Sequence, residues 1–410
     1  MSKASKITWG VIAGLLVGLV WALTPVYLFF SHQKGWPMPP WGFVAMPENA
    51  PTTSHSVAPR YRAVADEALA HLNDHRKEIH APGISAAVAV GGRLVWAGAA
   101  GWADIEQLRE VTPYTQFRIG STSKPVTATA AARLVQEEQL RLDQPLKQYP
   151  LALPNSQWGE LTVRDLASHT SGLPEYKENR DWMGLYHTMA LRKRYESVQK
   201  SLLVFDGTEL LYPPGEQFHY TTFNTVLLSA VMEAAAGVPY RRVMNDRVFD
   251  PLNMTMTRPE PSSPIKTMAT FYWREGERLR PWRTVDLSHR LAGGGFISTP
   301  TDLVKLGSAW PDEDYLSPSV RSLFWEPQRL ANGDVNEQNY ALGWRIHQAD
   351  DYMAMNANHG GVSRGAQSWL MVIPEYQMSV AVMINSRTEA FWDFGKVAVV
   401  LAHLFQNPDP

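Results

Sequence analysis

The chain has 410 residues, with 40 acidic and 38 basic side chains, a formal net charge of -2 and no cysteine. The near-neutral charge suggests neither a nucleic acid nor a strongly anionic surface as a partner, so no nucleic-acid binding is predicted. The lack of cysteine excludes disulfides and attachment to a lipid through an N-terminal cysteine.

The first predicted element is an apolar helix. Ile7 to Phe30 carries no charge over about 24 residues, roughly 36 Å as a helix, whereas a bilayer core is about 30 Å thick. Lys3 and Lys6 precede this run, and such positive flanks favour the cytoplasmic side. We therefore expect residues 1–30 to be a retained signal anchor, single-pass in the inner (cytoplasmic) membrane, with the catalytic domain periplasmic or extracytoplasmic. A cleaved signal peptide is the alternative, but its apolar core is usually shorter.

Residues 31–60 are rich in proline and contain few residues able to build a core, so we interpret them as an extended tether. The next segment, Tyr61 to Ile79, has the pattern of an amphipathic surface helix. His71 and His75 lie one turn apart on it, but no third ligand follows at a convincing spacing. Neither a metal site nor a cofactor is therefore predicted.

The most informative stretch runs from Phe117 to Lys124 and sets a serine and a lysine three residues apart at a predicted helix start. Positions i and i+3 share a helix face, so the Lys124 amine can lie over the Ser121 hydroxyl. A serine hydroxyl is a weak nucleophile until a base takes its proton. The pair therefore predicts a nucleophile and its activator. A capped helix with a solvated lysine is the alternative, because the spacing alone is common.

Further segments follow in an order that makes the pattern specific. They are Pro82-Gly83-Ile84, Gly98 to Asp104, Leu166 to Leu173, Pro214 to Tyr220, Gly293 to Thr299 with Asp302, Leu342-Gly343-Trp344 and His359-Gly360-Gly361. Together with the Ser121 segment they resemble the serine beta-lactamase and penicillin-binding-protein-like hydrolases, in the branch of class C beta-lactamases, D-alanyl-D-alanine carboxypeptidases and esterases. The resemblance covers nearly all of the chain after about residue 60.

The second motif of that family is usually Tyr-x-Asn, whereas here Tyr220 and Thr222 precede an apolar helix from Val226 to Ala235. The Tyr-x-Thr form resembles LACTB-like serine hydrolases. The resemblance implies that Tyr220 accepts or relays the serine proton together with Lys124. Thr222 is the expected substrate-binding residue, but it lacks the amide donor of asparagine. A core tyrosine before a helix is the alternative for Tyr220.

Lactamases carry Lys-Thr-Gly as their third motif, and the matching position here is His359-Gly360-Gly361, before a strand-like run from Ser368 to Ile373. Glycines at this place let a substrate carbonyl approach the strand. The resemblance implies that the N–H groups of Val362 and Ser121 form an oxyanion hole. His359 is expected to bind substrate and to lend partial positive charge or move a proton. A loop histidine beside a glycine turn is the alternative.

Three more polar residues receive less specific interpretations. His169 could belong to a catalytic triad, but in the resembled family its segment is structural. Asp302 fits the first turn of a helix capped by Thr299 or Thr301. Arg364 is a candidate for holding a substrate carboxylate, although a solvated loop arginine is favoured.

The resemblance implies a fold of the α/β (α+β) class for residues 61–410: an antiparallel sheet built from both ends of the domain and flanked by helices, with a helical lobe over about 143–288. The expected activity is hydrolysis of an ester or a peptide-like amide through an acyl-enzyme. A D-alanyl-D-alanine carboxypeptidase acting on cell-wall peptide, or a beta-lactamase, is the nearest alternative. A non-catalytic, membrane-anchored binding or scaffold protein is the alternative from another class. The substrate and the oligomeric state stay open.

Overall fold

The computed structural model describes residues 3–34, 36–56, 58–205, 207–276, 278–388 and 391–406. An antiparallel sheet lies at its centre, in the order β1-β3-β2-β13-β12-β11-β10, with β4 beside β3. These strands are β1 (Thr52–Ser56), β2 (Gly83–Val90), β3 (Arg93–Asp104), β4 (Arg109–Glu110), β10 (Arg345–His347), β11 (Asn356–Ser363), β12 (Ala366–Ile373) and β13 (Met378–Ile384). Because β2 pairs with β13, strands from the two ends of the domain meet in the middle of the sheet, which confirms the predicted fold class.

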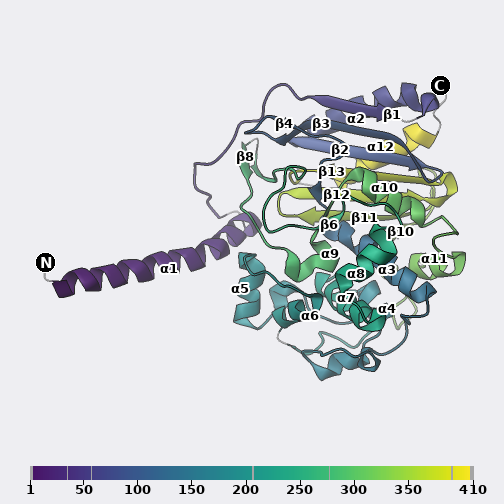
Figure 1. The fold of residues 1–410 in the computed structure, drawn as a ribbon. Coiled ribbons are helices and arrows are strands. Elements are labelled where there is room, and N and C mark those ends of the chain that lie inside the picture. Colours follow the sequence, from purple (N-terminus) through teal and green to yellow (C-terminus); the bar gives the residue numbers. More distant parts are fainter. Residues whose placement is uncertain are drawn as a thin grey trace.

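Helices cover both faces of this sheet (Figure 1). The α-helices are α1 (Lys3–Lys34), α2 (Arg62–Glu78), α3 (Ser123–Gln136), α4 (Val163–Ser168), α5 (Trp182–Ala190), α6 (Val198–Ser201), α7 (Thr222–Ala236), α8 (Tyr240–Met244), α9 (Leu291–Gly294), α10 (Pro300–Ala309), α11 (Pro318–Trp325) and α12 (Phe391–Gln406). α2 and α12 pack on one face with Val88, whereas α10 and α3 share a core with Ala87. Successive strand residues therefore serve two cores, which explains why every residue of β13 is buried.

The helical lobe lies below the sheet in Figure 1 and holds α4 to α8, inside the predicted range of 143–288. The end of that range contributes to two small sheets beside the central one. There β6 (Arg258–Pro259) pairs with β9 (Phe296–Ser298), beside β5 (Phe117–Arg118), and β7 (Tyr272–Glu275) pairs with β8 (Arg278–Pro281). The N–H of Tyr272 donates to the carbonyl of Asn385 at 2.9 Å. The hairpin of β7 and β8 therefore packs on the sheet side of the molecule.

The N-terminal helix α1 projects from the body (Figure 1). Among the described helices it alone is long and apolar enough, by length and composition, to cross a bilayer. Nearly all side chains from 6 to 24 are exposed, whereas Pro25 and Ser31 are buried. The helix thus continues past the predicted end at residue 30, and its last turns pack on the body.

The predicted tether over residues 31–60 differs from an extended linker. Val44 forms a β-bridge with Leu279 of β8, and the Arg280 guanidinium lies 4.4 Å from the ring centre of Phe43. β1 adds an edge strand along β3. Phe43 and Val44, between the prolines, and the polar strand β1 make these contacts, so the segment is part of the folded body.

Candidate active site

The predicted serine and lysine lie where β5 leads into α3. A 3-10 turn, Gly120–Thr122, comes first and α3 begins at Ser123, two residues later than predicted. Gly120 has a φ of +50°, and a Cβ there would lie 2.5 Å from the carbonyl oxygen of Val362. Only glycine fits this turn, since it tolerates a positive φ and the close strand. The turn brings Ser121 Oγ to 3.2 Å from Lys124 Nζ.

Lys124 Nζ has two further polar neighbours. It lies 3.1 Å from the carbonyl oxygen of Gly293 and 3.3 Å from Thr222 Oγ1. Burial lowers the pKa of the Lys124 amine below its ordinary value, and Tyr220 opposes this shift through its charge and a hydrogen bond. A neutral amine can donate its two protons to Gly293 and Thr222 while its lone pair faces the Ser121 hydroxyl. The geometry therefore suits a lysine that accepts a proton from the serine.

Tyr220 lies on the other side of the same amine. Lys124 Nζ is 4.6 Å from the centre of the Tyr220 ring. Thr221 caps α7 by accepting a hydrogen bond from the N–H of Phe223, which fixes Tyr220 just outside the helix and Thr222 at its first position. The Tyr-x-Thr motif thus places both side chains against Lys124, on the side of the helical lobe.

His359 occupies a different setting from the one expected. Its side chain is buried on β11, where Nδ1 donates to the carbonyl of Gly360 at 2.7 Å. Its Nε2 lies 3.0 Å from the Tyr340 hydroxyl and 3.3 Å from a guanidinium nitrogen of Arg345, both of which can donate to it. Burial, followed by the positive charge of Arg345, lowers the pKa of His359 well below its ordinary value. The ring is therefore neutral, which does not support the expected partial charge or proton transfer.

The glycines after His359 let β11 pass directly over the serine turn. A Cβ on Gly361 would lie 1.9 Å from the carbonyl oxygen of Ile119 and 2.8 Å from the backbone nitrogen of Thr122. Val362, the next residue, lines the same cavity as Ser121. The strand backbone and the serine turn are thus held together at a distance that no larger residue would allow.

His169 ends α4 in a left-handed conformation with a φ of +61°. Its Nδ1 accepts from the amide of Asn224 at 3.2 Å, and the amide oxygen of Asn224 accepts from Ser171 at 2.6 Å. Burial lowers the pKa of His169 well below its ordinary value, and its ring lies 4.4 Å from that of Tyr220. A neutral, fixed ring beside Tyr220 agrees with the structural role predicted for this segment.

A cavity of about 230 Å³ opens at Ser121 and is lined also by Thr222 and Val362. Arg364, for which a solvated loop position was favoured, is partly buried and belongs to the wall of this cavity. Sequence reasoning missed other neighbours: the wall also includes Gln33, Arg290 and Arg387, and behind it lie Asn224, Tyr340 and Arg345. Arg345 directly follows the predicted Leu-Gly-Trp segment, which was the one available signal. A larger cavity of about 540 Å³ contains none of the predicted site residues.

Comparisons with known proteins match these motifs. A family model described as Beta-lactamase matches residues 65–403. The chain is 30% identical over 390 residues to the mitochondrial serine beta-lactamase-like protein LACTB of Homo sapiens, across 74% of this chain and 71% of that protein. The octameric penicillin-binding protein homologue from Pyrococcus abyssi shares 25% identity and a TM-score of 0.66, over 82% of this chain and 77% of the other.

A further solved structure shows the same fold. EstCE1, described as a hydrolase with promiscuous acyltransferase activity, superposes with a TM-score of 0.69 at 22% identity, over 83% of this chain and 98% of the other. The matches confirm the family resemblance drawn from the motifs.

Proposed function

The chain belongs to the beta-lactamase family of serine hydrolases, and on that premise we propose that it is a membrane-anchored, extracytoplasmic hydrolase that works through an acyl-enzyme on Ser121. The observation that carries this proposal is the 3.2 Å contact between Ser121 Oγ and the buried amine of Lys124. Activation of a serine needs a nearby base in its deprotonated form, and burial favours that form because it lowers the pKa of the Lys124 amine.

The proposed reaction has two steps. Ser121 Oγ attacks the carbonyl carbon of an ester or peptide-like amide while Lys124, with Tyr220, takes its proton. The N–H groups of Ser121 and Val362 stabilise the oxyanion. The carbon–oxygen or carbon–nitrogen bond then breaks, and the same proton passes to the leaving group. Water attacks the acyl-enzyme in the second step, releasing the acid and restoring the Ser121 hydroxyl.

The other residues of the predicted site receive supporting roles in this proposal. Thr222 lies at the cavity and also hydrogen-bonds Lys124, so it orients the amine as well as meeting substrate. Gly360 and Gly361 keep the β11 backbone close enough to the serine turn for a substrate carbonyl to lie between them. His359 acts as a positioning residue, because its two nitrogens tie the strand to Arg345.

Covalent labelling tests the acyl-enzyme. The full-length protein in detergent is treated with a fluorophosphonate probe and, separately, with a fluorescent penicillin. We expect fluorophosphonate labelling of the native protein and none in Ser121→Ala. Ser123→Ala is the matched control, because Ser123 is a buried serine of the same segment whose hydroxyl lacks a hydrogen-bond partner among the described residues.

The outcomes separate the candidate functions. Penicillin labelling that is lost in Ser121→Ala favours a peptidase of cell-wall peptide, whereas fluorophosphonate labelling alone favours an esterase or another peptidase. Labelling that persists in Ser121→Ala removes this serine as nucleophile. Absence of labelling by either probe favours a binding or scaffold protein.

The proposed anchor is α1, with the amino end in the cytoplasm and the body in the periplasm or its equivalent. Its exposed apolar surface from residue 6 to 24 supports this placement, and so do the lysines at 3 and 6. Expressed in bacteria, the protein is expected to stay in the membrane fraction after alkaline extraction and to be digested by protease added outside spheroplasts. A soluble mature product that lacks α1 contradicts the anchor and favours a cleaved signal peptide.

A further inference from the structure

The end of α1 forms part of the wall of the Ser121 cavity. Gln33 lines the cavity together with the serine. The ring of the preceding residue, His32, stacks on Trp282 with 3.9 Å between ring centroids. One turn earlier, the centre of the Phe29 ring lies 5.7 Å from the guanidinium carbon of Arg364. The helix proposed to cross the bilayer is therefore packed against the catalytic body at the mouth of its site.

The exposed part of α1 locates the bilayer relative to this mouth. Residues 6–24 make a helix of roughly 28 Å, close to the thickness of a hydrocarbon core of about 30 Å. Gln33 follows about nine residues later, which is roughly 14 Å along the helix axis. The headgroup layer itself takes up about 5–7 Å of that distance. The Ser121 cavity thus opens just above the headgroups.

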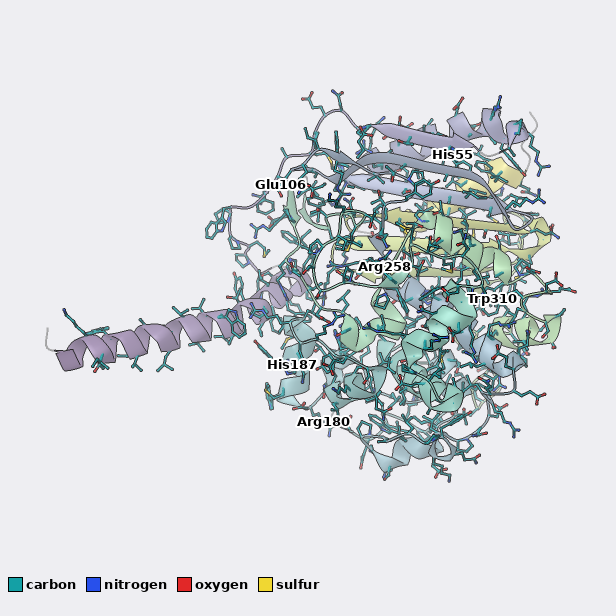
Figure 2. The ribbon with its side chains drawn as sticks, viewed as in Figure 1. His55, Glu106, Arg180, His187, Arg258 and Trp310 are labelled. Atoms are coloured by element: carbon teal, nitrogen blue, oxygen red, sulfur yellow. The ribbon has the colours of Figure 1, made fainter. Side chains whose placement is uncertain are left out.

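Exposed aromatic side chains lie on both sides of the bilayer edge that this placement gives. Trp21, Tyr27 and Trp36 are all exposed, and the rings of Tyr27 and Trp36 lie 5.7 Å apart. α5, which carries the His187 labelled in Figure 2, packs beside α1. Arg192, just after α5, donates a hydrogen bond to the carbonyl of Trp21 at 2.9 Å. Tryptophan, tyrosine and basic residues concentrate where a protein meets the lipid surface. Exposed aromatic side chains therefore follow the chain from Trp21 to Trp36, past Gln33 of the cavity wall.

The cavity itself is positively charged. Arg290, Arg364 and Arg387 line it, and the described lining contains no carboxylate. Burial, together with the charges of the other arginines, lowers the pKa of Arg364 to about 9. Like charges gathered in a partly buried site repel each other, and an anion between them removes that repulsion. The cavity therefore favours binding of a negatively charged group next to Ser121.

We propose that the Ser121 cavity takes its substrate from the bilayer surface, and that this substrate is an anionic acyl amphiphile. Its negatively charged headgroup lies among Arg290, Arg364 and Arg387, its scissile ester lies at Ser121, and its acyl chain leads back along α1. The inference rests on the proposed acyl-enzyme and anchor. In the reaction the acyl carbon–oxygen bond breaks, the anionic alcohol leaves with the serine proton, and water releases the fatty acid from Ser121.

The test uses the full-length protein in phosphatidylcholine vesicles that contain either phosphatidic acid or diacylglycerol with the same isotope-labelled chains. Phosphatidic acid and diacylglycerol carry the same acyl esters, and only phosphatidic acid carries a phosphate. Release of labelled fatty acid is measured by mass spectrometry. We expect phosphatidic acid to react about tenfold faster or more than diacylglycerol, as charge-assisted contacts allow. In Arg364→Gln and Arg387→Gln the ratio of the two rates falls towards one.

Controls separate this inference from the proposed function. Arg258→Gln, an exposed arginine on β6 (Figure 2), is expected to keep the native ratio. Water-soluble dibutyryl phosphatidic acid is expected to react far more slowly than the long-chain form in vesicles. Equal rates on the two guest lipids, or efficient use of the dibutyryl form, overturn the inference. If the native protein neither hydrolyses p-nitrophenyl butyrate nor reacts with a fluorophosphonate, the proposed function itself fails.

Discussion

Replacing Lys124 by methionine removes the amine and keeps an unbranched side chain of similar length. The amine of the native protein is within 3.3 Å of Ser121, Thr222 and the Gly293 carbonyl. Loss of a general base lowers rates by about 10²–10⁴, or roughly 3–5 kcal/mol of transition-state stabilisation. Thr222 and the Gly293 carbonyl each lose a hydrogen bond to the amine, which lowers the free energy of unfolding by about 1–3 kcal/mol for each group. Part of this loss is offset, because the variant no longer buries a polar amine. We therefore expect a folded protein with almost no reactivity.

The assay is the rate of fluorophosphonate labelling of Lys124→Met from about pH 6 to 10, with urea unfolding as the check on stability. The native rate should rise with pH, because the amine acts as a base only when deprotonated. The rise should be centred below the ordinary lysine value of about 10.4, since burial lowers the pKa of Lys124. Lys147→Met, which removes an exposed lysine paired with Glu160 at 2.8 Å, should label like the native protein. A Lys124→Met rate within about threefold of native, with an unchanged pH profile, would refute the reasoning.

Three further predictions concern the surroundings of the serine. Gly361→Ala should lower the free energy of unfolding by about 1–3 kcal/mol or more and reduce labelling, because the added Cβ lies 1.9 Å from the Ile119 carbonyl oxygen; unfolding and labelling of this variant as in the native protein would contradict it. His359→Gln should leave the shape of the pH–rate profile between about pH 5.5 and 8 unchanged, because burial already keeps the imidazole neutral there; a native step near 6.5 that disappears in the variant would argue for a titrating histidine. Arg118→Met should cost about 3–5 kcal/mol in urea unfolding, because it strands the buried Glu260 carboxylate 2.6 Å from the lost guanidinium, and adding Glu260→Gln should recover part of the loss.

The local sequence pattern was sufficient to predict features that depend on residues close together in the chain. The spacing of Ser121 and Lys124 predicted their contact because a turn entering a helix brings i and i+3 together, and the structure has them 3.2 Å apart. The strand-like run from Ser368 to Ile373 is part of β12, and Thr299, one of the two predicted caps, does cap α10. Both were readable because burial on both faces and capping leave direct traces in the sequence.

The contacts around His359 could not be read in the same way. Histidine in the third motif suggested a charged or proton-moving group, but Tyr340 and Arg345 reach its ring only because β10 pairs with β11. The neutral state of the ring follows from burial and from a neighbouring cation, and both are properties of the assembled sheet. No motif in the sequence predicts the burial of this ring or its contact with Arg345.

The sequence by itself determined the family, the fold class, the identity of the candidate nucleophile and the presence of one long apolar helix, because these depend on residue type and short-range spacing. Only the tertiary structure decided where that helix ends and what it touches. Gln33 and Ser121 are far apart in the chain, yet they line one cavity with arginines from three separate segments. Such a site forms when packing brings distant segments together, and the free energy that selects that packing is spread over the whole core.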